Sequence, residues 1–231
     1  MGATSLESNR KREFIIKQRT LLYMSGKSEI SMRLNIKILL YLMISSYAEA
    51  QTETMRGVSC VNKTNELTTS RIIPKYISEP LPGALFVDYL TYAARCGMEP
   101  NPSLLEVSDK PNFYFIPDPK IDYYAIFMFD PDAPAPEAPI LSPILHYASC
   151  NILKNKTDTG ITLADYLLPT PLSVAPHRYI TFVFTQKDIL PVEICFQGRY
   201  SLRRFFFPLK KTIAELNLTY YGVQFYNVGL T

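Results

Sequence analysis

The feature that most constrains the fold is an unbroken hydrophobic run, residues 123–129, which ends in the motif Asp130-Pro131-Asp132-Ala133-Pro134. A run of this length without a polar interruption is typical of a strand buried on both faces, or of a sandwich core strand. Proline fixes its own φ and keeps the preceding residue out of the helical region. The pattern therefore predicts two carboxylates held on a stiff backbone at the end of a buried strand, which suits a pre-formed binding site.

Other short hydrophobic segments follow along the chain, separated by proline-rich joints. Besides the run above, strands are predicted at residues 85–89, 112–115, 144–152, 179–184 and 220–228. Residues 162–166 are expected to form one helical turn, and residues 201–211 the main helix, interrupted at Pro208. Many short strands with few helices indicate an antiparallel, mainly β domain. We predict one domain over residues 71–231, preceded by a mobile polar arm, residues 51–70, that Cys60 could tie down.

The first fifty residues differ in composition from the rest. Residues 38–44 form a short apolar run after a basic stretch that starts at Met32, and Ala48-Glu49-Ala50 follows. This order predicts a secretory signal peptide cleaved after Ala50, with residues 1–31 as an upstream extension. The run is too short to cross a bilayer of about 30 Å. An uncleaved signal anchor is the alternative.

The formal charge of +3 comes from this leader. Residues 1–50 hold 8 of the 24 Lys/Arg and 4 of the 21 Asp/Glu, which leaves 16 basic against 17 acidic residues beyond them. A nearly neutral remainder argues against a protein that binds nucleic acid over its whole surface.

The cysteines and glycosylation motifs agree with secretion. All four cysteines lie after the predicted cleavage point, and an even number suits two disulfides with three possible pairings: Cys60, Cys96, Cys150 and Cys195. None has the Cys-x-x-Cys spacing of a zinc site. Three sequons also lie beyond residue 50, at Asn62, Asn155 and Asn217.

The only two histidines of the chain lie near the acidic motif and near a third strand. His146 enters the predicted strand 144–152, where strict alternation would place it on one face with Ala148 and Cys150. His177 shares a face with Tyr179. If these strand ends meet Asp130 at one rim, the site holds a carboxylate, two imidazoles and a phenol, a set suited to a small phosphate-bearing anion.

The order of these motifs resembles the phosphatidylethanolamine-binding protein family. The resemblance rests on the Asp130–Pro134 motif, on His146-Tyr147 and on His177-Arg178-Tyr179, and it covers roughly residues 70–228. It implies an antiparallel, β-sandwich-like fold with a small anion pocket lined by Asp130, His146, His177 and Tyr179. Asp132, Pro134 and Arg178 would support that pocket, with Arg178 paired to an acid such as Asp132.

The resemblance also implies partners: phospholipid headgroups or similar anions, and for some members a protease or a kinase pathway. Many members have Trp-His directly before the first pocket histidine, where this chain has Ile144-Leu145. The glycine that is usual two residues before the second pocket histidine, His177, is Ala175 here. Those differences would reshape the pocket wall. Some members carry a helix after the last strand, and because this sequence ends at Thr231 we expect a more open pocket mouth.

Three functions fit these residues: a secreted binding protein for headgroups, a secreted inhibitor or signalling ligand, and a metal enzyme using both histidines and Asp130. No hydrolase, metalloprotease or phosphate-loop motif is present, so we predict no enzyme, no cofactor and no metal. We expect a monomer that binds no nucleic acid. The aromatic run 205–207, flanked by basic residues, is predicted to be core, with a peripheral membrane patch as the alternative.

Overall fold

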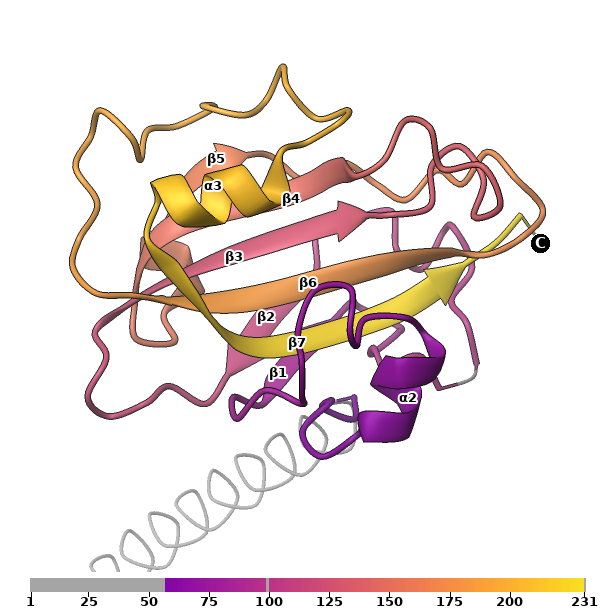
Figure 1. The fold of residues 1–231 in the computed structure, drawn as a ribbon, viewed down its shortest axis with the longest axis horizontal. Helices are drawn as coiled ribbons and strands as arrows, with labels where there is room; N and C mark the ends of the chain where they lie inside the picture. Colours follow the sequence, from indigo (N-terminus) through magenta and orange to yellow (C-terminus); the bar gives the residue numbers. More distant parts are fainter. Residues whose placement is uncertain (1–56, 99, 231) are drawn as a thin grey trace, which may run out of the picture. The chain divides into compact units, whose positions relative to one another are not determined.

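A five-stranded antiparallel sheet forms the centre of the protein, with strand order β5-β4-β3-β6-β7 (Figure 1). The structure is a computed structural model that describes residues 57–98 and 100–230. The predicted signal peptide and its cleavage point lie outside these residues. The strands of the sheet are β3 (Tyr123–Asp130), β4 (Ile144–Leu153), β5 (Ile161–Ala164), β6 (His177–Gln186) and β7 (Leu218–Val228).

Each face of this sheet is covered by other elements, so the protein has two hydrophobic cores. The second core lies between the sheet and a small antiparallel sheet of β1 (Leu85–Asp88) and β2 (Asn112–Phe115). The first core, on the other face, is closed by α2 (Thr64–Thr69), α3 (Leu209–Glu215) and the loop between β6 and α3. A short 3-10 helix, η1 (Thr157–Thr159), joins β4 to β5.

Strand β3 is buried on both faces, as its sequence predicts. Phe127 and Phe129 pack in the first core, whereas Tyr124, Ile126 and Met128 pack in the second. This alternation follows from the period-2 geometry of a strand. Because β3 lies between β4 and β6, its last residue, Asp130, is brought to the edge of the sheet where β4 and β6 begin.

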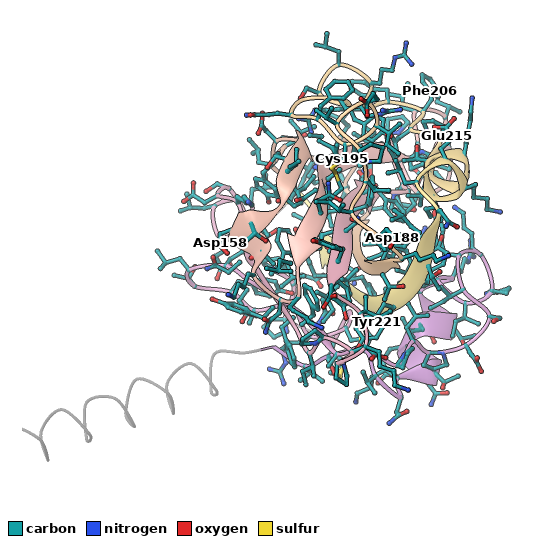
Figure 2. The ribbon with its side chains drawn as sticks, turned by 90° about the vertical axis from the view of Figure 1, so that its left-hand side faces the viewer. Asp158, Asp188, Cys195, Phe206, Glu215 and Tyr221 are labelled. Atoms are coloured by element: carbon teal, nitrogen blue, oxygen red, sulfur yellow. A yellow bond between two sulfur atoms is a disulfide. The ribbon has the colours of Figure 1, made fainter. Side chains whose placement is uncertain are left out.

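Two predicted elements differ from the structure. Residues 161–164 form β5, paired to β4 with Ala148 opposite Ala164, rather than a helical turn. The helix predicted over residues 201–211 begins only at Leu209, because Pro208 precedes it and supplies no backbone donor to an earlier turn. Residues 187–208 form a long loop instead, with Cys195 and Phe206 at the upper end of the view in Figure 2.

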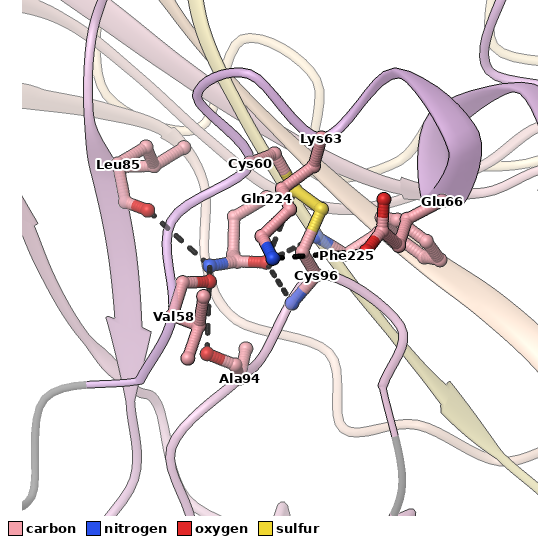
Figure 3. The surroundings of a disulfide bond; sticks show 9 residues. All are labelled: Val58, Cys60, Lys63, Glu66, Leu85, Ala94, Cys96, Gln224 and Phe225. Carbon is pink, nitrogen blue, oxygen red and sulfur yellow. Dashed lines mark hydrogen bonds and ion pairs between the residues drawn. A yellow bond between two sulfur atoms is a disulfide. The ribbon is translucent and has the colours of Figure 1, made fainter.

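Two disulfides join distant parts of the chain: Cys60–Cys96 and Cys150–Cys195. Beside the first, the buried side chain of Gln224 in β7 accepts hydrogen bonds from the backbone N–H groups of Cys96 (2.8 Å) and Phe225 (2.9 Å) (Figure 3). Its amide donates to the carbonyl of Val58 at 2.9 Å. The described part of the polar arm is therefore tied to the sheet, and it contains α2, which the sequence analysis did not anticipate.

Candidate functional site

Three strands place the four predicted pocket residues on one side of the sheet. Asp130 is the last residue of β3, His177 the first residue of β6, and Tyr179 lies two positions later on the same strand. The Nδ1 atom of His177 lies 2.8 Å from Oδ2 of Asp130, and the rings of His146 and Tyr179 meet edge to face at 5.0 Å. The structure thus brings together all four side chains.

The hydrogen bonds of His177 favour its charged form. The hydroxyl of Ser173 donates to the carbonyl of Ala175 at 2.9 Å, so it can only accept from Nε2 of His177, at 3.1 Å. Nδ1 faces the carboxylate of Asp130, which also needs a donor. Burial by itself lowers the pKa of His177, but the hydrogen bond and the negative charge of Asp130 outweigh it and raise that pKa.

A β-bulge determines which face of the sheet His146 points to. The pairing of β3 with β4 slips between Met128 and Phe129, which lie opposite Tyr147 and Leu145, so His146 is the extra residue. It therefore faces Tyr179 and not the side of Ala148 and Cys150, and the predicted strict alternation is wrong at this position.

The environment of His146 keeps its ring neutral. Its Nδ1–H donates to the carbonyl of Leu167 at 2.6 Å, and its Nε2 has no hydrogen-bond partner among the described residues. Burial disfavours the charged ring and lowers the pKa of His146 to about 4. At neutral pH the Nε2 atom is therefore a free acceptor.

Tyr179 presents a buried donor to the same place. Its side chain is fully buried, yet its hydroxyl makes no hydrogen bond of good geometry with any described residue. Burial, with the nearby charge of Asp130, raises the pKa of Tyr179, so the hydroxyl keeps its proton. A buried hydroxyl without a partner is uncommon in folded proteins and marks a place where a ligand or water would bind.

Asp132 and Arg178 form the support of the site. The guanidinium of Arg178 donates to both carboxylate oxygens of Asp132, at 2.8 Å from Nε and 2.5 Å from the terminal nitrogen. Arg178 also donates to the carbonyl of Ser70, and the Asp132 backbone N–H donates to Asp130 at 2.7 Å. The peptide bond before Pro134 is cis. This pair fixes the turn after β3, and with it the Asp130 carboxylate.

A loop of residues 165–176 covers both histidines. The backbone N–H of Leu167 donates to the carbonyl of His146 at 2.7 Å, the His146 ring donates to the Leu167 carbonyl, and Ser173 contacts His177. As a result Asp130, His146 and His177 are only 1–2% exposed. A ligand can reach the site only if this loop moves, which the sequence did not indicate.

A cluster of tyrosines beyond the pocket was missed by the sequence analysis. Tyr226 stacks on Tyr179 at 5.7 Å, and its hydroxyl lies 2.5 Å from that of Tyr89. The Tyr89 hydroxyl lies 3.1 Å from that of Tyr166, which donates to the carbonyl of Val107. Because each hydroxyl has one proton, Tyr226 donates to Tyr89 and Tyr89 to Tyr166. These tyrosines come from distant segments of the chain, so the sequence could not show that they meet. Only the pairing of Tyr226 with Tyr179 could have been predicted, because the two residues lie opposite each other on neighbouring strands.

Neither a metal site nor a membrane span is found in the described part of the chain. No group of three or more His, Cys, Asp or Glu side chains in residues 57–98 and 100–230 is arranged to hold a metal ion. Likewise, no helix of these residues is long and apolar enough to cross a bilayer.

Comparison with known proteins places the chain in a family. The sequence profile of the phosphatidylethanolamine-binding protein family matches residues 88–220, more than half of the chain. The chain belongs to this family. Its members are non-enzymatic binding and inhibitor proteins, in agreement with the prediction that the chain is not an enzyme.

Curated relatives include two plant proteins. The chain is 35% identical over 82 residues to rice MOTHER of FT and TFL1 homolog 2, which covers 35% of this chain and 46% of that protein. It is 30% identical over 125 residues to TERMINAL FLOWER 1 of Arabidopsis thaliana, covering 54% of this chain and 62% of that protein. The chain thus spans about half the length of these relatives.

Solved structures confirm the predicted fold. The carboxypeptidase Y inhibitor, solved with its cognate proteinase, superimposes with a TM-score of 0.60 at 20% identity, over 72% of this chain and 94% of that one. A phosphatidylethanolamine-binding protein from Plasmodium vivax gives 0.58 at 20% identity, over 72% and 97%. At this identity the likeness concerns the fold alone, which is mainly β with few short helices.

Proposed function

We propose that this protein is a secreted, non-enzymatic binding protein for phosphate-bearing small anions such as phospholipid headgroups, which bind beside Asp130, His146, His177 and Tyr179. The observation that carries the proposal is the buried hydroxyl of Tyr179, which makes no hydrogen bond of good geometry with any described residue, on a ring that meets the neutral ring of His146 edge to face at 5.0 Å. The Tyr179 hydroxyl can donate to a phosphate oxygen, and the Nε2 of the adjacent His146 ring can accept from a protonated phosphate oxygen or from the ammonium of a zwitterion.

Asp130 has a positioning role in this proposal. Its Oδ1 accepts from the Asp132 backbone and its Oδ2 pairs with the charged ring of His177. The carboxylate therefore balances the charge of His177 and fixes its ring, while the contacts to ligand come from Tyr179 and His146.

Proton NMR of the full chain, titrated with phosphoethanolamine, tests the proposal. The chain has only two histidines, so a His146→Gln variant assigns both imidazole signals. We expect both sets to shift together and to saturate. Inorganic phosphate and ethanolamine, titrated separately, distinguish recognition of the phosphate from recognition of the amine. Imidazole signals that stay fixed in all three titrations would contradict the proposal.

A single-atom change sharpens this test. Tyr179→Phe removes the unpartnered hydroxyl and should weaken phosphoethanolamine binding by about tenfold or more, as expected for a lost hydrogen bond to a charged group. Its thermal stability should change little, since at most a poorly aligned contact with the Thr170 backbone is lost. Tyr124→Phe is the matched control, because the Tyr124 hydroxyl accepts from the backbone of Asp118, away from the site.

An inhibitor or signalling ligand that docks on a protease or kinase-pathway partner is the second candidate. The loop over the pocket exposes Leu168 (42%), Leu172 (71%) and Val174 (82%), an apolar rim suited to a protein partner. The structural likeness to a carboxypeptidase inhibitor makes a protease a reasonable partner class to screen. Phosphoethanolamine should compete if the partner uses the pocket; a partner that binds only the rim should ignore it.

Secretion is part of the proposal and has its own support. The asparagines of all three sequons, Asn62, Asn155 and Asn217, are exposed, and all four cysteines are paired. Expression in eukaryotic cells, followed by N-terminal sequencing of protein from the medium, should find Gln51 as the first residue. Protein retained in cells with residues 1–50 attached would contradict it.

A further inference from the structure

The loop of residues 187–208 carries a concentration of exposed apolar side chains. Of the sixteen large hydrophobic side chains exposed among the described residues, this loop holds six: Ile189, Val192, Phe196, Leu202, Phe205 and Phe206. Leu202 is 98% exposed, and Phe205 and Phe206 are 57% and 62% exposed. The predicted core role of the run 205–207 therefore holds only for Phe207. Figure 2 shows Phe206 at the opposite end of the view from Tyr221.

Basic side chains surround these apolar tips. Residues 194–214 contain five Lys/Arg and no Asp/Glu, although the chain beyond residue 50 is almost neutral. Arg204 is used internally, because it donates to the carbonyls of Ser201 and Leu145. Arg199 is half-buried and donates to the carbonyl of Glu193 at 3.0 Å, whereas Arg203, Lys210 and Lys211 are exposed.

A hollow of about 430 Å³ lies between this loop and α3. Its walls include Phe196, Tyr200, Phe207, Arg199, Arg203 and Lys211. The guanidinium of Arg199 lies 5.6 Å from the ring centre of Phe196 and 5.4 Å from that of Tyr200, so both rings hold it in place. Glu215 is the one acid on the wall, and it forms an exposed ion pair with Lys211 at 3.6 Å.

Tyr200, on the wall of this hollow, has a buried polar group without a partner in the described part of the chain. Its side chain is 8% exposed, and its buried hydroxyl has no hydrogen-bond partner among the described residues. An anionic group such as phosphate that enters beside the three cations of this wall and reaches that hydroxyl would satisfy it.

Hydrogen bonds hold the loop in this shape. The backbone N–H of Phe206 donates to Leu141 at 3.2 Å, that of Phe207 donates to Pro143 at 2.9 Å, and Cys195 is bonded to the sheet. Phe206 has a φ of 52°, which is unfavourable for a bulky residue and is maintained here by these bonds. The outward direction of Phe205 and Phe206 is thus fixed by the fold.

We propose that this loop and α3 form a docking surface for anionic phospholipid bilayers. Leu202, Phe205 and Phe206 would enter the interfacial region, the basic side chains would face the headgroups, and one lipid phosphate would occupy the hollow. Lysine is depleted at the core of protein interfaces, so the pair Lys210 and Lys211 beside protruding apolar tips favours a lipid surface. This surface belongs to the first core, on the opposite face of the sheet from the pocket histidines.

The absence of tryptophan makes insertion directly measurable. Phe206→Trp introduces the only tryptophan of the full chain, and Leu90→Trp does the same outside the loop at a site that is even more exposed, 87% against 62%. With vesicles of phosphatidylcholine containing about 30 mol% phosphatidylserine, we expect a blue shift and quenching by brominated lipid for Phe206→Trp alone. An equal blue shift and equal quenching at both positions would overturn the proposal. Because the leader is present in both variants, lipid binding by the leader alone does not affect this comparison.

Charge reversal gives a second test with a matched control. Arg203→Glu with Lys211→Glu should weaken binding to these vesicles at least about 20-fold, whereas Lys120→Glu with Lys156→Glu, the same change elsewhere, should have little effect. Binding by the unchanged protein should weaken with salt and disappear on pure phosphatidylcholine. Equal losses from both pairs would overturn the proposal.

Tyr200→Phe tests the hollow itself. This variant should bind the vesicles several-fold more weakly while its melting temperature stays the same or rises, because the hydroxyl makes no internal hydrogen bond. Separate titrations with inorganic phosphate and with soluble poly-glutamate test whether the hollow binds an anion that does not come from a lipid. Binding of poly-glutamate through Arg203 and Lys211, with no binding to vesicles, would overturn the bilayer in favour of an acidic polypeptide.

Discussion

His146 and His177 lie on the same side of the sheet but are held in opposite protonation states. Asp130 compensates the charge of His177, whereas the ring of His146 faces a carbonyl and an aromatic ring and stays neutral. Linkage then gives each residue its own effect on stability. The raised pKa of His177 gives a stabilising contribution that is complete below about pH 6.5 and is lost as the pH rises through the higher value.

For His146 the sign is reversed. Its pKa falls from the ordinary 6.5 to about 4, so the unfolded chain binds more protons between these values. Acidification from pH 6.5 to 4 should therefore lower the free energy of unfolding by about 3 kcal/mol through this residue alone. Urea unfolding of the native protein and of His146→Gln across this range measures the difference.

His177→Gln serves as the control for this pair of effects. This variant should still lose unfolding free energy on acidification, because His146 is present, but it should not lose the His177 contribution above about pH 6.5. If the free energy of unfolding changes equally with pH in the native protein and in His146→Gln between pH 4 and 6.5, the ring of His146 is not held neutral by burial.

At the scale of elements, the site depends on how three segments are joined and not on strand pattern alone. The sequence predicted that β3 would end at Asp130 and that His177 would begin β6. It could not predict the bulge at His146, because a bulge is a property of the pairing between β3 and β4. Alternation gave His146 the wrong face for that reason.

The ion pair of Arg178 and Asp132 links the start of β6, the turn after β3 and the carbonyl of Ser70 that follows α2. Arg178→Met would leave the carboxylate of Asp132, which is 3% exposed, without its charged partner and with only the backbone N–H of residue 178 as a donor from that position. We expect a loss of about 3–5 kcal/mol in the free energy of unfolding, measured by urea denaturation.

A second substitution distinguishes lost charge pairing from lost packing. Adding Asp132→Asn to Arg178→Met removes the unpaired charge, so the double variant should recover part of that stability. A double variant as unstable as the sum of both single changes would indicate that the two side chains act independently.

At the scale of the whole molecule, composition and spacing predicted a mainly β domain, and the motif order pointed to its family. They did not predict which hydrophobic residues would remain exposed. Residues 205–207 are all phenylalanine, yet only Phe207 is buried, because hydrogen bonds to residues 141 and 143 turn its neighbours outward. The disulfide pairing was equally open until the loops were placed: Cys150 lies on the buried strand β4 and Cys195 on the long loop.

That second disulfide should therefore affect the loop more than the pocket. Replacing Cys150 and Cys195 by alanine opens a link between residues 45 apart, which should cost about 3–4 kcal/mol of stability. If the bond holds the basic and aromatic loop in place, the blue shift of Phe206→Trp on anionic vesicles should also decrease, while the imidazole shifts with phosphoethanolamine persist.

Replacing Cys60 and Cys96, 36 residues apart, is the matched control: it should cost similar stability but leave vesicle binding intact. Equal losses of vesicle binding from both pairs would show that binding follows global stability and not the shape of the loop.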